Sequence, residues 1–165
     1  MASPSSTQLG AIAENLIANT LMIESGGRLA PFLPQADDDG IDLLIYDKET
    51  GKALPAQIKS RTVALKKRGS QERGNTVHFE VRHAAFKAER FAALICVLTS
   101  DRGYGIDCAW VIPMADLPDL ARQSATKYII RPSKSVHSKD RCTDYRCSVP
   151  AELHDRVMQM LAQAP

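Results

Sequence analysis

The chain of 165 residues has no apolar run long enough to cross a bilayer. Its longest run, residues 91–98, has eight residues, whereas a membrane-spanning helix needs about 20. The first residues are rich in serine and proline and lack the basic and apolar stretches of a signal peptide. We therefore expect no membrane partner and a cytoplasmic location.

Aromatic residues and cysteines are also few. Aromatic side chains make up 5% of the sequence, with Trp110 as the single tryptophan, so the chain offers no evident platform for stacking the bases of single-stranded nucleic acid. The four cysteines include no CxxC pair, and Cys142 and Cys147 have no second pair at a zinc-binding spacing. We therefore expect reduced thiols rather than disulfides or structural zinc.

The composition is that of a globular domain, with 44% hydrophobic and 24% charged residues and no internal repeat. We expect a flexible N-terminus over residues 1–7 and a single domain over residues 8–162. The net charge of +2 hides an asymmetry, because residues 1–60 hold four basic and eight acidic side chains, whereas residues 61–165 hold 17 and 11. This asymmetry favours a polyanionic partner.

Local patterns predict helices and strands in a mixed order. Apolar residues recur at helical spacing over residues 9–22, with Ser5, Ser6 or Thr7 as N-cap and Gly26-Gly27 as the stop. Further helices are predicted over residues 83–91, over residues 114–123 with an interruption at Pro118, and over residues 151–162. Strands are predicted over residues 29–33, 41–46, 53–60, 76–81, 94–98, 109–112 and 127–130, the last at a sheet edge. This order indicates an α/β fold in which helices flank a mixed sheet.

The strands over residues 41–46 and 53–60 are joined by a short polar turn and are predicted to form a hairpin. If the turn is centred between Glu49 and Thr50, paired residues have numbers that sum to 99, and Asp42 faces Gln57. Alternation along the second strand places Lys59 on the same face as Gln57. Pro55 predicts a bulge or a strand start. Three polar groups thus converge at the rim of an apolar core, where charge needs a partner or a function.

These residue types suit metal-assisted attack on a phosphodiester. The carboxylate of Asp42, the amide oxygen of Gln57 and the main-chain carbonyl of Ile58 are oxygen ligands of the kind that Mg²⁺ prefers. The ammonium of Lys59 can hold the attacking water or stabilise developing negative charge. Glu14 lies beside the apolar face of its predicted helix, so it could supply a second carboxylate. The alternative for Asp42 and Lys59 is a cross-strand ion pair on a solvated face.

Glu14 preceded by Gly10, the segment Asp39-Gly40-Ile41-Asp42 and the segment Gln57-Ile58-Lys59 together resemble the PD-(D/E)xK nuclease superfamily. The resemblance covers roughly residues 8–61 and implies a restriction-endonuclease-like fold with an αβββαβ core. It also implies that Asp42 and Gln57 are metal ligands, that Lys59 is the catalytic lysine and that Glu14 is the helix-borne acid. Gln57 stands where the family usually has an acid, a QxK variant that lowers the negative charge of the site and should weaken metal binding.

Residues 61–75 form a basic loop that either is a solvated connection or contacts nucleic-acid phosphates. Its basic side chains are Arg61, Lys66, Lys67, Arg68 and Arg73. The Asp37-Asp38-Asp39 run is interpreted as a solvated turn, with Asp39 as a spare ligand.

The leading hypothesis is a nuclease that hydrolyses DNA phosphodiesters with Mg²⁺ or Mn²⁺ and, by analogy, acts as a homodimer so that both strands are cut. One alternative is a nucleic-acid-binding or assembly module of the same fold that has lost turnover. Another is a protein-interaction domain in which the motif residues are accidental.

Overall fold

The structure is a computed structural model that describes residues 3–36 and 39–165. Residues 1–2 of the predicted N-terminal segment and residues 37–38 of the predicted acidic turn lie outside the described residues. The helices are α1 (Ser6–Glu24), α2 (Leu117–Leu120) and α3 (Pro150–Gln163), with short 3₁₀ turns η1 (His83–Ala85), η2 (Asp101–Gly103), η3 (Met114–Asp116) and η4 (Thr143–Tyr145). The strands are β1 (Leu29–Phe32), β2 (Leu43–Asp47), β3 (Ala53–Arg61), β4 (Phe79–Arg82), β5 (Ala93–Thr99), β6 (Ile106–Pro113), β7 (Arg122–Gln123), β8 (Lys127–Ile130) and β9 (Arg146–Cys147).

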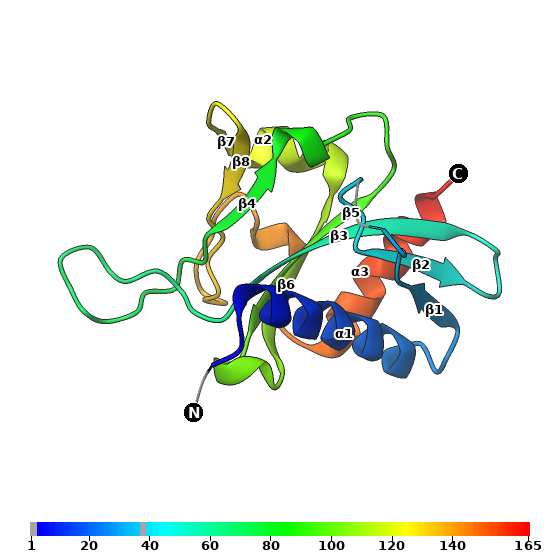
Figure 1. Ribbon diagram of the computed structural model, residues 1–165, viewed down its shortest axis with the longest axis horizontal. Coiled ribbons are helices and arrows are strands. Elements are labelled where there is room, and N and C mark those ends of the chain that lie inside the picture. The colour runs from blue at the N-terminus through cyan, green and yellow to red at the C-terminus, as the bar shows by residue number, and fades with distance from the viewer. Residues whose placement is uncertain (1–2, 37–38) are drawn as a thin grey trace.

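A six-stranded sheet in the order β1-β2-β3-β5-β6-β9 forms the centre of the molecule (Figure 1). Its strands are antiparallel except for the parallel pair β3 and β5. A parallel pair needs a long crossover, which here includes β4 and a projecting segment. A smaller sheet has the order β4-β8-β7. The predicted α/β fold with a mixed sheet and flanking helices is confirmed.

Both faces of the central sheet are covered. Helices α1 and α3 pack on one face, where Ile17 and Val157 meet strand residues such as Ile95. The small sheet and η3 cover part of the other face, where Phe79 packs on Trp110 with ring centroids 5.8 Å apart. Strand β5 lies between these layers, and all seven of its residues are buried, which explains its continuous apolar sequence.

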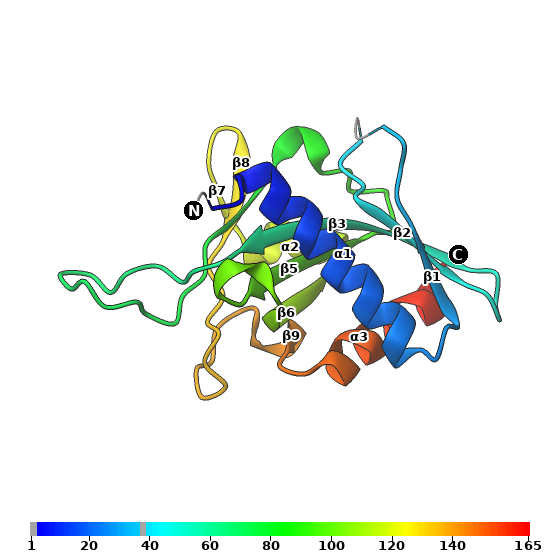
Figure 2. The same cartoon turned by 60° about the horizontal axis from the view of Figure 1, so that its bottom comes forward.

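Helix α1 lies diagonally across the sheet (Figure 2). It begins at Ser6 rather than at residue 9, so Ser6 and Thr7 of the predicted N-terminal segment are helical. Ser5 is the N-cap in a capping box with Gln8, one of the three candidate caps. The predicted stop is also confirmed, because Gly26 and Gly27 have φ of 59° and 83° directly after the helix. No helix among the described residues is both long and apolar enough to span a membrane.

The predicted hairpin has the predicted register. Leu43 pairs with Ala56 and Leu44 with Pro55, so the numbers sum to 99. Pro55 lies inside β3 rather than at a bulge or strand start, which corrects the prediction. The reason is that pairing of β3 with β5 begins only at Ala56, so the missing N–H of Pro55 faces no neighbouring strand there.

The predicted helix over residues 83–91 is wrong, since only the 3₁₀ turn η1 forms. The N-cap position, Arg82, makes no side-chain cap, and tertiary contacts hold the segment in another shape. Phe86 packs on Tyr128, while Lys87 and Arg90 reach Asp39. Such long-range contacts outweigh the modest helical propensity of a short segment.

Two predictions for the C-terminal half also need correction. The predicted helix over residues 114–123 is η3, α2 and then β7, and Pro118 lies in the first turn of α2 instead of interrupting a helix. The strand over residues 127–130 exists, but it is the middle strand of the small sheet rather than an edge.

Candidate active site

The site begins at the open end of the β2–β3 hairpin. Asp42 directly precedes β2, and its N–H donates to the carbonyl oxygen of Ala56 over 2.9 Å. One carboxylate oxygen, Oδ2, accepts a hydrogen bond from the N–H of Ile58 over 2.6 Å. These two bonds fix the carboxylate beside the main chain of the Gln57-Ile58-Lys59 segment.

A pocket of about 420 Å³ lies at this end and is shared by three segments that are distant in sequence. Asp42 comes from the hairpin, Ile58 and Lys59 from β3, and Glu14 from α1. Glu14 is half-buried, one position after the fully buried Ala13. The remaining lining residues are Ser6, Thr7, Leu9, Gly10, Ser60, Arg61 and Thr62.

Gln57 lies in an adjoining pocket rather than in the one just described. Alternation along β3 explains this, because Ile58 joins the core beneath α1 whereas Gln57, one position earlier, lies on the other side of the sheet. The adjoining pocket, about 340 Å³, is lined by Asp39, Gly40, Gln57, Lys59, Arg82, Ala84 and Ala85. Lys59 therefore lines both pockets.

Gln57 is 4% exposed, and its Oε1 has no hydrogen-bond partner in the described part of the chain. A buried acceptor without a partner is uncommon and calls for an explanation. Gly40 lies against this amide. It has φ of +69°, and a Cβ there would lie 3.0 Å from Cβ of Ala85 and 3.1 Å from Nε2 of Gln57. Glycine is thus required for both backbone conformation and space.

The donor atoms of the two pockets suit a hard divalent cation, because they are carboxylate, amide and main-chain carbonyl oxygens. Glu14 and Asp42 would supply carboxylates, Ile58 a carbonyl, and the partnerless Oε1 of Gln57 an amide oxygen. Among residues 3–36 and 39–165, no three side chains of His, Cys, Asp or Glu gather as a metal site. The candidate ligands include only two acids because position 57 holds a glutamine.

Asp39, the spare ligand of the sequence analysis, is an ion-pair partner in the structure. Its carboxylate contacts Lys87 and Arg90, and its main-chain oxygen accepts from Arg90 over 2.9 Å. The hydrogen bond from Lys87, followed by the charge of Arg90, lowers the pKa of Asp39 below its ordinary value. These two cations come from the segment predicted as a helix, so local patterns gave no sign of this contact.

The predicted basic loop is an arm, residues 62–76, that projects from the body of the molecule in both views (Figures 1 and 2). Its backbone is paired like a hairpin, with a bridge between Lys66 and Arg73. Lys67 pairs with Glu72 over 3.1 Å, and Lys66 donates to Gln71 over 2.7 Å. The candidate DNA contacts Arg61, Lys66, Lys67, Arg68 and Arg73 are all exposed, and Arg61 also lines the Glu14 and Asp42 pocket.

The opposite end of β2 carries a second carboxylate that the sequence analysis did not single out. Asp47 is 1% exposed and accepts hydrogen bonds from Arg28, over 2.8 and 2.7 Å, and from the hydroxyl of Thr50. The N–H of Glu49 donates to it as well. The Arg28 hydrogen bond is the main reason that the pKa of Asp47 lies well below its ordinary value.

Comparisons with known proteins bear on the fold. No protein-family model matches the sequence, and no curated protein matches it. Among solved structures, the chain is similar to the bacterial homing endonuclease I-Ssp6803I, with a TM-score of 0.61 and 17% identity over 96% of each chain. The chain has the restriction-endonuclease-like fold. The fold that the sequence resemblance implied is thereby confirmed.

Proposed function

We propose that the protein is a divalent-metal-dependent nuclease that hydrolyses DNA phosphodiester bonds at the pocket formed by Glu14, Asp42, Ile58 and Lys59. The observation that carries the proposal is that Glu14, Asp42, Ile58 and Lys59, which come from three segments, line one pocket. The fold shared with a homing endonuclease supports the same reaction class.

In this proposal Asp42, Glu14, the Ile58 carbonyl and the Gln57 amide hold Mg²⁺ or Mn²⁺. The cation would supply Lewis acidity toward a phosphodiester oxygen. The N–H of Ile58 keeps the Asp42 carboxylate in place, so its orientation does not depend on the ligand. The ammonium of Lys59 orients the attacking water and stabilises negative charge as it develops on the phosphate.

The partner is DNA, and the arm contacts its backbone through exposed lysines and arginines. Each phosphate contact releases counterions, so binding should weaken steeply with salt. Arg61 lines the active-site pocket and directly precedes the arm. The cationic surface of the arm is therefore continuous with the proposed centre of reaction.

We further propose that the protein is a homodimer located in the cytoplasm, where its four buried cysteines stay reduced. The outer face of β1 and β2 is a candidate for the interface, since Phe32 is 55% exposed and pairs across the strands with Leu44, 38% exposed. Sedimentation should show a dimer in the wild type and a monomer for Leu44→Lys.

The decisive experiment is calorimetric titration of Mg²⁺ and Mn²⁺ into the wild type and Asp42→Ala, followed by cleavage assays on linear, circular, branched and single-stranded DNA. We expect binding that Asp42→Ala abolishes, and cleavage that Lys59→Ala abolishes without loss of metal binding. Intact DNA in every assay with Mn²⁺ would contradict the proposal.

The neutral Gln57 favours a second candidate, a DNA-binding or assembly module of the same fold without turnover. It predicts salt-sensitive DNA binding and no thermal stabilisation by divalent cations. Gln57→Glu separates the two candidates. In a working metal site it should lower the melting temperature without metal, because it buries a charge, and strengthen metal binding, whereas in a binding module it should only destabilise.

A further inference from the structure

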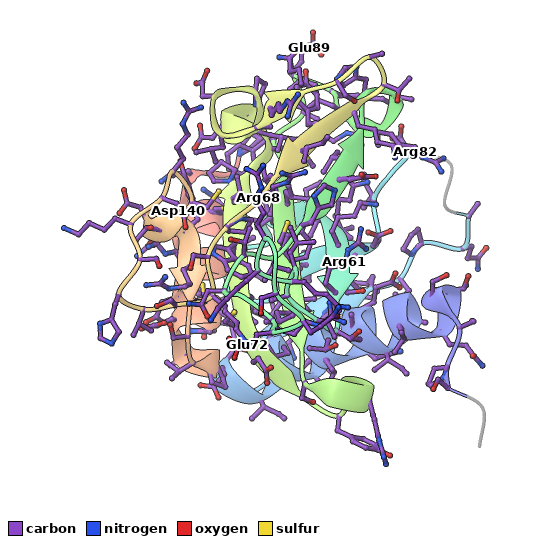
Figure 3. The ribbon with its side chains drawn as sticks, turned by 90° about the vertical axis from the view of Figure 1, so that its left-hand side faces the viewer. Arg61, Arg68, Glu72, Arg82, Glu89 and Asp140 are labelled. Atoms are coloured by element: carbon purple, nitrogen blue, oxygen red, sulfur yellow. The ribbon has the colours of Figure 1, made fainter. Side chains whose placement is uncertain are left out.

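The pocket beside the proposed active site has features of an anion site. We call it the Arg82 pocket, and its seven lining residues are Asp39, Gly40, Gln57, Lys59, Arg82, Ala84 and Ala85. Arg82 is the last residue of β4, and its side chain is exposed. Figure 3 shows Arg82 and Arg61 on the same side of the molecule, both above α1 in that view.

The charge of this pocket is positive. No carboxylate of the described residues lies within 4.0 Å of the basic groups of Lys59 or Arg82 in an ion pair. The acid in the lining, Asp39, is already paired with both Lys87 and Arg90. Lys59 and Arg82 therefore line the pocket beside a carboxylate that Lys87 and Arg90 already neutralise, and the pocket attracts an anion.

The shape of the pocket suits a ligand that approaches closely. Gly40, Ala84 and Ala85 present little side-chain bulk, and Gly40 already lies too close to Ala85 to accept a Cβ without movement. The cationic groups of Lys59 and Arg82 beside these small residues are suited to a phosphate group.

We propose that the Arg82 pocket binds the phosphodiester next to the one held at Asp42 and Lys59, with Arg82 as its principal ligand. Lys59 lines both pockets, so a single DNA strand that crosses Lys59 places one phosphate in each. The planar guanidinium of Arg82 can donate two hydrogen bonds to one phosphate, which a lysine cannot match. The inference rests on the proposed function, because two adjacent phosphates of a strand are the ligands.

The test compares thymidine 3′,5′-bisphosphate with thymidine 5′-monophosphate, both titrated calorimetrically into wild type, Arg82→Ala, Arg82→Lys and Lys59→Ala. Arg82→Ala should weaken the bisphosphate about tenfold and leave the monophosphate nearly unchanged. Arg82→Lys should recover part of the loss, and Lys59→Ala should weaken both ligands. Lys48→Ala, in the exposed turn at the far end of the hairpin, is the control and should change neither affinity.

Equal weakening of both ligands by Arg82→Ala would overturn the inference, because it would indicate a general charge effect. Unchanged affinity for the bisphosphate in Arg82→Ala, or no bisphosphate binding by the wild type, would overturn it as well. These measurements need no turnover, so they remain separate from the nuclease assay. Selective bisphosphate binding without any DNA cleavage would retain the Arg82 pocket and reject the proposed hydrolysis.

Discussion

Each end of the β2–β3 hairpin has an aspartate, and the surroundings of the two aspartates differ. At the turn end, Asp47 is buried and its two oxygens accept hydrogen bonds from Arg28, Thr50 and the N–H of Glu49. At the open end, Asp42 accepts from the N–H of Ile58 and lines a pocket with Glu14 and Lys59. A carboxylate enclosed by fixed donors stabilises the fold, whereas one beside a pocket is placed to meet a ligand.

The largest effect should come from Asp42→Asn, which removes the carboxylate charge at the open end of the hairpin. We expect DNA cleavage to fall by about 10²–10⁴-fold, because the charged oxygen that faces the cation and phosphate is lost. The asparagine Oδ1 can still accept from Ile58, so the melting temperature should change little. Single-turnover cleavage checks the loss of activity, and thermal melting checks the stability. A large drop in melting temperature would show that Asp42, like Asp47, mainly stabilises the fold.

Asp47→Asn should show the reverse pattern. It breaks a largely buried ion pair with Arg28 and should lower the free energy of unfolding by about 2–4 kcal/mol. Cleavage per folded molecule should stay at the wild-type level. Urea unfolding measures the loss, and Glu49→Gln is the matched control, since this exposed partner of Arg28 should contribute less than about 1 kcal/mol.

Acid should destabilise the fold partly by protonating Asp47 at the turn end of the hairpin. The folded pKa of Asp47 is depressed, so its contribution to stability is complete above about pH 4, the unfolded value, and is lost as pH falls toward the folded value. Glu80 acts in the same direction, because hydrogen bonds from Lys127 and then His78 lower its pKa to about 2. Unfolding free energy should therefore decline between about pH 4 and pH 2, and less steeply in Asp47→Asn. Identical slopes for the two proteins would contradict this assignment.

The smallest expected effect is the difference in stability between two alanine substitutions, one at Gly40 and one at Gly51, which lie at opposite ends of the hairpin. Gly40 and Gly51 both have positive φ, +69° and +74°, so alanine at either position should cost about 1 kcal/mol. At Gly51 the nearest atom to a Cβ is the Tyr46 hydroxyl at 3.9 Å, whereas at Gly40 the Cβ would crowd Ala85 and Gln57. Gly40→Ala should thus be the more destabilising and should also weaken metal binding. Equal effects in urea unfolding and calorimetry would argue against a tight contact at Gly40.

The sequence by itself determined the features that depend on neighbours in the chain. The short turn after Tyr46 sets the pairing of Leu43 with Ala56, and helical spacing with a Ser5 cap and the double glycine sets α1. The apolar run that becomes β5 is buried on both sides as its composition requires. From these elements the mixed α/β fold and the proximity of Asp42 to the Gln57-Ile58-Lys59 segment could be predicted, because hairpin pairing and periodicity are local.

Only the tertiary structure decided what lies opposite those elements. It brought Glu14 of α1 to the Asp42 pocket, put Gln57 and Lys59 beside Arg82, and held Asp39 with cations from a segment that periodicity predicted as a helix. Packing of α1 and α3 on one face of the central sheet and of the small sheet on the other decides which layer the side chains of β3 meet. The physical reason is that these contacts join groups far apart in the chain, and their free energy comes from packing and charge neutralisation that no local pattern records.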